Sequence, residues 1–226
     1  MCCVVQSIGG PSHAYVICPL EFERRALLQA GVGKYCEVSC CGPGGSAARQ
    51  GVRSIAITDR PIILAGLAGA LREDISKGSA YVATRVIDDA GHSWRPTGIA
   101  KGNLPDPSGP TIISTSHTIT STQDKRALAQ RSGADLVDLE SAGFAEAASA
   151  AGRRWAIVRG VSDGLHDALP EDIDEWVDEQ GRARTSAVIA AILRRPALVG
   201  EVRRLRADSI EAMNAVAEVI DSMLSA

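Results

Sequence analysis

The chain reads Leu136-Val137-Asp138-Leu139-Glu140-Ser141 and, a helix length later, Trp155-Ala156-Ile157-Val158-Arg159-Gly160-Val161-Ser162-Asp163-Gly164. Each stretch is an apolar run typical of a buried strand, with a carboxylate at its end. Because ligands of open α/β sheets bind outside the carboxyl ends of the strands, we expect Glu140 and Asp163 to share a cleft. Taken singly, each acid also fits a helix cap or a turn.

Apolar runs and helical periods alternate along the rest of the chain, which favours an α/β fold with a mixed or parallel sheet. Strands are expected at 14–18, 34–40, 61–65 (stopped by the glycines from Gly66), 79–87, 110–115, 135–138 and 155–161. Helices are expected at 20–30, at 122–132, at 141–151, and from 182 with a break at Pro196. A further helix is expected to begin after Ser46, which would be its N-cap. Residues 89–110, rich in Gly, Pro, Asp and Asn, predict a long surface excursion. We expect one domain over residues 1–226, with a helical C-terminal extension from about residue 182.

Composition excludes several classes of protein. The 226 residues carry 24 Lys and Arg against 27 Asp and Glu, a net charge of −3, which argues against a nucleic-acid partner. No run approaches the roughly 20 apolar residues of a membrane span, and the first residues do not resemble a secretory signal, so we expect a cytoplasmic protein. In that compartment the six cysteines are expected to be free thiols. The four scattered histidines do not have metal-ligand spacing, so we expect no metal.

A glycine turn supports an alternative function. The run Gly42-Pro43-Gly44-Gly45-Ser46-Ala47 fits G-x-G-x-x-A, and Asp59 follows near where a dinucleotide fold places its ribose-binding acid. This pattern keeps an NAD-dependent oxidoreductase as an alternative. Pro43 argues against it, because proline lacks a backbone N–H for a pyrophosphate, and the glycines equally fit a tight turn without a ligand.

Together, the two opening stretches resemble the signature of the nucleoside phosphorylase and nucleosidase superfamily, a "[DE]-M-E-[SA]" strand end followed by "(V/I)-R-(G/A)-(I/V)-S-D". Further blocks resemble family motifs in the same order, at Leu20–Glu23, Gly42–Gly45, Ala65–Leu71 and Lys77–Val82. The resemblance covers roughly residues 14–165. It implies a three-layer fold with a mixed central sheet and helices on both faces, and a homo-oligomer, with a dimer favoured.

The C-terminal part, with Gly181-Arg182 and Arg195-Pro196 before a last helix, is similar to the hopanoid-associated branch, proposed to remove adenine from adenosylhopane. The resemblance therefore implies a purine nucleoside phosphorylase or nucleosidase acting on an adenine nucleoside, possibly one substituted at the 5′ position.

The resemblance also assigns roles to four residues. Asp163 would protonate N7 of the leaving purine, and its apolar strand end would raise its pKa so that it stays neutral. Ser162 would orient Asp163. Glu140 would accept hydrogen bonds from the ribose hydroxyls. Glu23 would activate water in a nucleosidase or contact the substrate in a phosphorylase.

Further substrate contacts are expected from Leu139, Asp138, Ala68, Gly69, Gly42, Gly44 and Arg159. No cofactor is expected, but phosphate is a possible co-substrate, with Arg24, Arg72 or Arg159 as candidate ligands. Arg159 fits a structural ion pair with Glu140 or Asp138 equally well.

The hydroxyl-bearing residues of one family block are replaced here by Ala65 and Leu67, which predicts a weak phosphate site. Phosphorolysis and hydrolysis both remain open, as does a nucleoside-binding protein without catalysis or an interaction protein. His117 falls in the family's base-contacting loop, although a lone histidine there fits plain surface better. Trp94 and Trp176 could line an apolar mouth. A last apolar stripe, from Ile210 to Leu224, fits the core or a dimer seam.

Overall fold

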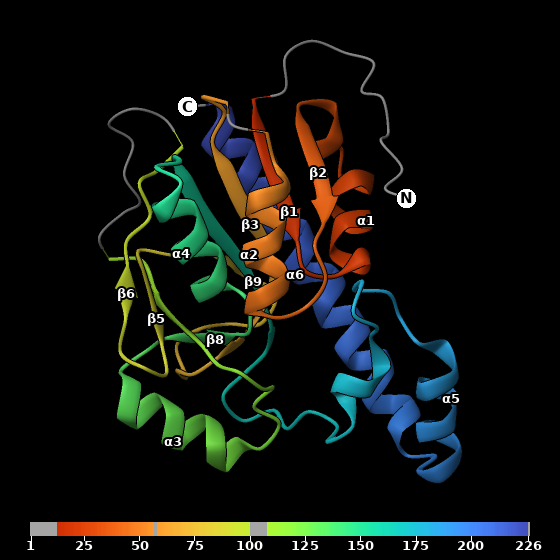
Figure 1. The fold of residues 1–226 in the computed structure, drawn as a ribbon. Helices are drawn as coiled ribbons and strands as arrows, with labels where there is room; N and C mark the ends of the chain where they lie inside the picture. Colours follow the sequence, from red (N-terminus) through yellow and green to blue (C-terminus); the bar gives the residue numbers. More distant parts are fainter. Residues whose placement is uncertain (1–12, 57, 100–107, 226) are drawn as a thin grey trace.

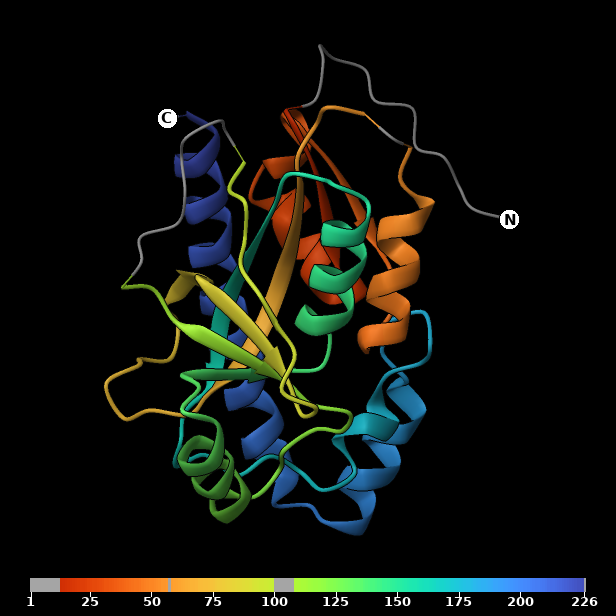
Figure 2. The ribbon, with the colours of Figure 1, turned by 60° about the vertical axis from the view of Figure 1, so that its left-hand side comes forward.

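The computed structural model describes residues 13–56, 58–99 and 108–225, and within them nine strands form one mixed sheet with helices on both faces (Figures 1 and 2). The strands are β1 (Ala14–Cys18), β2 (Cys36–Cys40), β3 (Ile62–Ala70), β4 (Ala80–Val82), β5 (Arg85–Asp88), β6 (Ser93–Trp94), β7 (Thr111–Ser114), β8 (Leu136–Asp138) and β9 (Trp155–Asp163). The helices are α1 (Glu21–Gln29), α2 (Gly45–Ser54), α3 (Thr122–Ser132), α4 (Ser141–Ala150), α5 (Thr185–Arg194) and α6 (Leu198–Ser225), with short 3-10 turns η1 (Val32–Lys34) and η2 (Ile173–Trp176).

The sheet is built around β3. Its path runs β2-β1-β3-β8-β7-β5-β6, and β9 pairs with β3 and with β4. Strand β3 runs parallel to β1 and to β9, the latter in register from Ile62 opposite Trp155 to Gly69 opposite Asp163. The carboxyl ends of β1, β3 and β9 therefore lie at one edge of the sheet.

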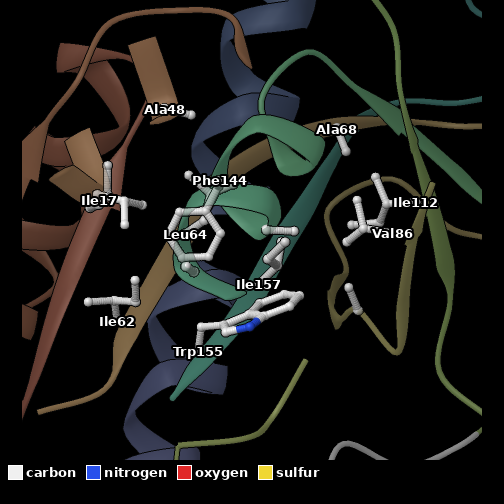
Figure 3. Close-up of a cluster of buried hydrophobic side chains, with 14 of the residues drawn as sticks. Ile17, Ala48, Ile62, Leu64, Ala68, Val86, Ile112, Phe144, Trp155 and Ile157 are labelled. Carbon is white, nitrogen blue, oxygen red and sulfur yellow. The ribbon is translucent and has the colours of Figure 1, made fainter. Parts of the chain in front are cut away.

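Residues of alternating parity along these strands build two core layers, as the pleat of a strand requires. On one face Ile17, Leu64 and Ile157 pack with Phe144 of α4 and Ala48 of α2 (Figure 3). On the other face Val16, Ile63 and Val158 pack with Leu27 of α1 and with Met213 and Ile220 of α6. The predicted helices on both faces are thus present.

Helices α2 and α4 approach each other unusually closely. A Cβ atom on Gly143 of α4 would overlap the backbone oxygen of Gly45 at the start of α2. Glycine at position 143 therefore sets the distance between the two helices, and with it the position of the turn that precedes α2.

Three local predictions are wrong. Strand β3 does not stop at Gly66 but continues to Ala70, because its pairing with β9 supplies hydrogen bonds along its whole length. Helix α2 begins at Gly45 with Gly44 as its N-cap, where φ is 89°, rather than at Ser46. The single strand expected at 79–87 is two strands, β4 and β5. Part of the expected excursion is the β5–β6 hairpin, and residues 100–107 lie outside the described part.

The C-terminal stripe is core, as one of its two interpretations predicted. Val216, Ala217 and Ile220 are buried against the sheet, whereas Ile210 at its beginning is 40% exposed. Trp176 is also buried, beside Ala191 of α5, so it does not line a mouth. In the described residues no helix is long and apolar enough to cross a bilayer.

The cysteines that the structure describes are free thiols, namely Cys18, Cys36, Cys40 and Cys41. Burial raises the pKa of Cys36 to about 11 and that of Cys41 to about 12. Both thiols are therefore protonated at neutral pH, which makes them poor nucleophiles.

Candidate active site

Glu23 lies in the first turn of α1, just beyond the end of β1. Its carboxylate accepts the backbone N–H of Leu20 at 2.8 Å, the reach-back that defines a helix start, and the N–H of Leu67 on β3, also at 2.8 Å. The side chain is buried, with 2% of the residue exposed. These contacts fix its carboxylate over the carboxyl-terminal half of β3.

The fully buried guanidinium of Arg159 on β9 is the centre of a charged cluster. Its Nη2 lies 2.5 Å from Asp138 Oδ2 and 3.1 Å from Glu140 Oε2. A Cβ atom on Gly66 would come within 2.6 Å of Arg159 Nη1 and 2.7 Å of Glu23 Oε1, so both groups lie directly over this glycine. Nε and Nη1 of Arg159 find no hydrogen-bond acceptor among the described residues. Buried donors of this kind usually meet a ligand or water.

Asp138 does not fit its predicted role in substrate binding. Its oxygens accept hydrogen bonds from Ser114 Oγ at 2.5 Å and from the backbone N–H and hydroxyl of Ser141, besides the ion pair with Arg159. All of these partners belong to the protein and the carboxylate is buried. Asp138 therefore positions Arg159 and the start of α4 instead of reaching a substrate.

Glu140 occupies the N-terminus of α2. Its Oε1 accepts the N–H of Gly44 at 2.9 Å, the cap of that helix. A helix N-terminus is a ready anion site, and in this protein the protein's own carboxylate fills it. The remaining oxygen faces Arg159 of β9 at 3.1 Å.

Burial, together with the charge of a neighbouring carboxylate, raises the pKa values of Glu23 and Glu140. Burial raises the pKa of Glu23 to about 7, against the attraction of Arg159. Burial also raises the pKa of Glu140, again opposed by Arg159. Burial acts to lower the pKa of Arg159, but the surrounding carboxylates raise it overall, so the guanidinium stays charged. A carboxyl group that titrates near neutral pH is well matched to general base catalysis.

Asp163 ends β9 with both carboxylate oxygens engaged. Ser162 Oγ donates to Oδ1 at 2.6 Å, as predicted for an orienting residue, and Lys125 Nζ of α3 forms an ion pair with Oδ2. A Cβ atom on Gly69 would lie 2.8 Å from Oδ2, so glycine is needed for this approach. The expected apolar surroundings of Asp163 are therefore wrong, because a buried ammonium group lies beside it.

Two subsites follow along β3. The Glu23–Arg159 cluster lies over Gly66, and Asp163 lies at Gly69, three residues or about 10 Å further along the strand. A small hollow at Asp163 is lined also by Ser162, Leu169, Pro170 and, from α6, Glu201, Arg204, Leu205 and Asp208.

The remaining predicted contacts fall into two groups. Ala68 and Gly69 lie on β3 beside Ser162, whose hydroxyl is 3.4 Å from the oxygen of Ala68, and Leu139 is half-buried before α4. Gly42, in contrast, is covered, because a Cβ atom there would overlap the oxygen of Glu179. With Gly44 also bound to Glu140, the glycine turn has no room for the pyrophosphate of a dinucleotide, and Asp59 is exposed. His117 is exposed too, as expected of plain surface.

Gly66 offers a direct test of this geometry. Gly66→Ala should lower kcat/KM at least tenfold, because the added methyl group would displace Glu23 or Arg159. Gly200→Ala on α6, where a Cβ atom meets nothing within 4 Å, is the matched control and should leave activity unchanged. Equal activity of the two variants would show that the cluster over Gly66 is not part of the site.

Comparison with known proteins agrees with this architecture. Residues 107–194 match the family model of the Phosphorylase superfamily. The structure of futalosine hydrolase of Helicobacter pylori strain 26695 is similar with a TM-score of 0.66 and 13% identity, over 95% of this chain and 97% of that one. The chain therefore shares the mixed α/β fold of that hydrolase.

Two further structures share the nucleosidase fold. The 5′-methylthioadenosine/S-adenosylhomocysteine nucleosidase from H. pylori gives a TM-score of 0.65 at 14% identity, over 95% of this chain and 98% of that one. An Asp→Asn variant of the Chlamydia trachomatis enzyme (MTAN), bound to MTA, gives 0.63 at 16%, with the same coverages. No curated protein matches the sequence. The predicted mixed α/β fold is confirmed.

Proposed function

We propose that this protein hydrolyses the N-glycosidic bond of a purine nucleoside. The observation that carries the proposal is the placement of two acids along β3, Glu23 over Gly66 and Asp163 at Gly69, about 10 Å apart along the strand. Glycosidic cleavage divides its work between a group that assists the leaving group and a group that acts on the nucleophile. The nucleosidase fold and the match to the Phosphorylase superfamily support this chemistry.

Each group has a distinct task in the proposed reaction. Asp163, oriented by Ser162, delivers a proton to N7 of the purine as the bond to the sugar breaks. Glu140 and the unpaired nitrogens of Arg159 bind the ribose hydroxyls. Glu23 removes a proton from the attacking water. The sugar gains the hydroxyl group and the base gains the proton, so the products are the free base and the free sugar.

Three observations favour water over phosphate as the nucleophile. Each candidate arginine is neutralised by the protein itself: Arg24 pairs with Glu21, Arg72 with Asp74 and Asp135, and Arg159 with Asp138 and Glu140. The backbone N–H groups of Gly44 and Leu67, which could bind an anion, are taken by carboxylates. A phosphate dianion would also face the negative charge of the cluster, which is costly in a buried site.

We further propose an adenine nucleoside with a 5′ substituent as the substrate. This rests on the sequence resemblance and on the relatives of similar fold, one of which is bound to MTA. Adenosylhopane, suggested by the resemblance of the C-terminal part, belongs among the candidates to be tested. The proposed reaction needs no cofactor.

The test is adenine release from a panel of 5′-substituted adenosines, with and without phosphate. We expect release at the same rate in phosphate-free buffer, with free ribose or its 5′ derivative as the second product. Turnover that requires phosphate and yields a sugar 1-phosphate would contradict hydrolysis. Tight nucleoside binding without base release would identify a binding protein instead.

A further inference from the structure

Lys125 is a buried cation of the site that the reaction described above leaves without a task. It comes from α3, far from Asp163 in sequence, and is fully buried. Its ammonium group has three partners: the carboxylate of Asp163, the backbone oxygen of Gly164 at 2.9 Å and that of Asp167 at 2.9 Å. An ammonium group has three N–H donors, so each donor has an acceptor.

The contacts of Asp163 imply that the resting carboxylate is ionised. Its Oδ1 accepts from Ser162 and its Oδ2 faces the ammonium group, an arrangement that stabilises the negative form. An ionised carboxylate has no proton to give to a leaving base. The proton must therefore be available elsewhere in the site. Two groups in direct contact with Asp163 carry one, the hydroxyl of Ser162 and the ammonium group of Lys125, and the ammonium group is the stronger acid.

We propose that Lys125 supplies, through Asp163, the proton that the leaving purine takes up. As the glycosidic bond breaks, one N–H of the ammonium group passes its proton to Oδ2 of Asp163, and the carboxyl group passes a proton to N7. Lys125 is left as a neutral amine and Asp163 as a carboxylate. The proton that Glu23 removes from water is released to solvent. After the base leaves, Asp163 takes up a proton from solvent and returns it to Lys125, which restores the resting state. Lys125 acts through Asp163 and is a positioning residue, since it is fully buried behind that carboxylate.

The other charged groups around Lys125 have their own partners. The carboxylate of Asp167 pairs with Lys77 at 3.2 Å, and Lys77 also pairs with Asp208 of α6 at 3.2 Å. On α3 itself, Asp124 binds Ser121 and Arg126 binds His166, both at the exposed face. From α6, Glu201 and Arg204 line the hollow at Asp163. Among the described residues, Asp163 is the carboxylate in direct contact with Lys125.

The proposal rests on the proposed function, and the test is the pH dependence of base release by Lys125→Arg and Lys125→Met. Arginine keeps the positive charge but does not release its proton, and methionine keeps the length without a charge. In both variants the proton must sit on Asp163 alone. We therefore expect the alkaline limb of the kcat profile to move to lower pH, with kcat at pH 8 about 10²-fold below that of the wild type and partial recovery in acid.

Lys77→Met, between β3 and β4, is the matched control, because it removes a nearby cation that pairs with Asp167 and Asp208 rather than with Asp163. Its pH profile should equal that of the wild type. Thermal unfolding of each variant shows whether it folds. A proton inventory of the wild-type protein, in which kcat is measured against the deuterium fraction of the solvent, tests the relay without any substitution. We expect a curve that requires two transferred protons. A Lys125→Arg variant with the wild-type profile, or a one-proton inventory, would overturn the relay. Absence of base release by the wild type would instead overturn the proposed function.

Discussion

Asp163→Asn should lower kcat for base release by about 10²- to 10⁴-fold while nucleoside affinity stays within a few-fold of the wild type. Asparagine keeps the shape and can still accept from Ser162, but it cannot pass a proton to the base. Single-turnover kinetics together with equilibrium binding separates the two effects. If Asp163 only capped a turn, asparagine would cap nearly as well, and near-wild-type release would refute the assignment.

Two variants control this experiment. Glu140→Gln removes an acceptor for the sugar, so it should weaken binding as well as turnover. Asp163→Asn also breaks a buried ion pair and leaves Lys125 without its counter-charge, which costs up to about 3–5 kcal/mol of unfolding free energy. The double variant Lys125→Met/Asp163→Asn removes both charges and should regain much of that stability without regaining activity. Urea unfolding of the three variants measures this.

The ends of strands β8 and β9 were predictable from the sequence because each strand is a continuous apolar run. Each run ends at or just before the carboxylate that the sequence analysis selected. Glu23 was within reach for the same reason, since it sits at the third position of a helix that follows a short apolar strand.

The glycines of β3 show where local pattern is misleading. Gly66 and Gly69 suggested a turn, whereas they continue a strand and give space to Arg159 and Asp163. In a sequence, a glycine that leaves space for a neighbouring side chain looks the same as a glycine that permits a turn. Only the residues of the adjacent strand distinguish the two cases. The partner strand β9 is about 90 residues further along the chain, so the sequence gives no local sign of it.

Lys125 was missed for a related reason. Within α3 it is one polar residue among many on a helix of low hydrophobicity, and only tertiary packing turns it toward Asp163, 38 residues away. Asp138 was assigned to the substrate because it adjoins Glu140, yet its partners Ser114 and Arg159 come from β7 and β9. Long-range pairs of polar groups are the part of the site that a single sequence does not disclose.

The titration of Glu23 should appear in the activity of the wild-type protein. Because burial raises its pKa to about 7, the carboxylate needed as a base is lost as the pH falls below 7. We expect kcat/KM to fall about tenfold per pH unit well below pH 7 and to approach its plateau about one unit above the pKa of Glu23. Glu23→Gln should lower kcat by about 10²- to 10⁴-fold and abolish that acid limb, as initial rates between pH 5 and 8 would show.

Because of the buried carboxyl group of Glu23, the unfolding free energy of the protein should fall as the pH rises. Between the ordinary value of 4.5 and about 7, the folded state holds the proton of Glu23 and the unfolded state does not, so unfolding free energy falls with increasing pH. The full loss is about 3 kcal/mol, at 1.36 kcal/mol per pH unit. Glu23→Gln, which has no charge to bury, should therefore gain stability relative to the wild type on going from pH 5 to pH 8. If the unfolding free energies of the two proteins had the same pH dependence, the pKa of Glu23 would not be raised by folding. The argument for Glu23 as a base that titrates near neutral pH would then fail.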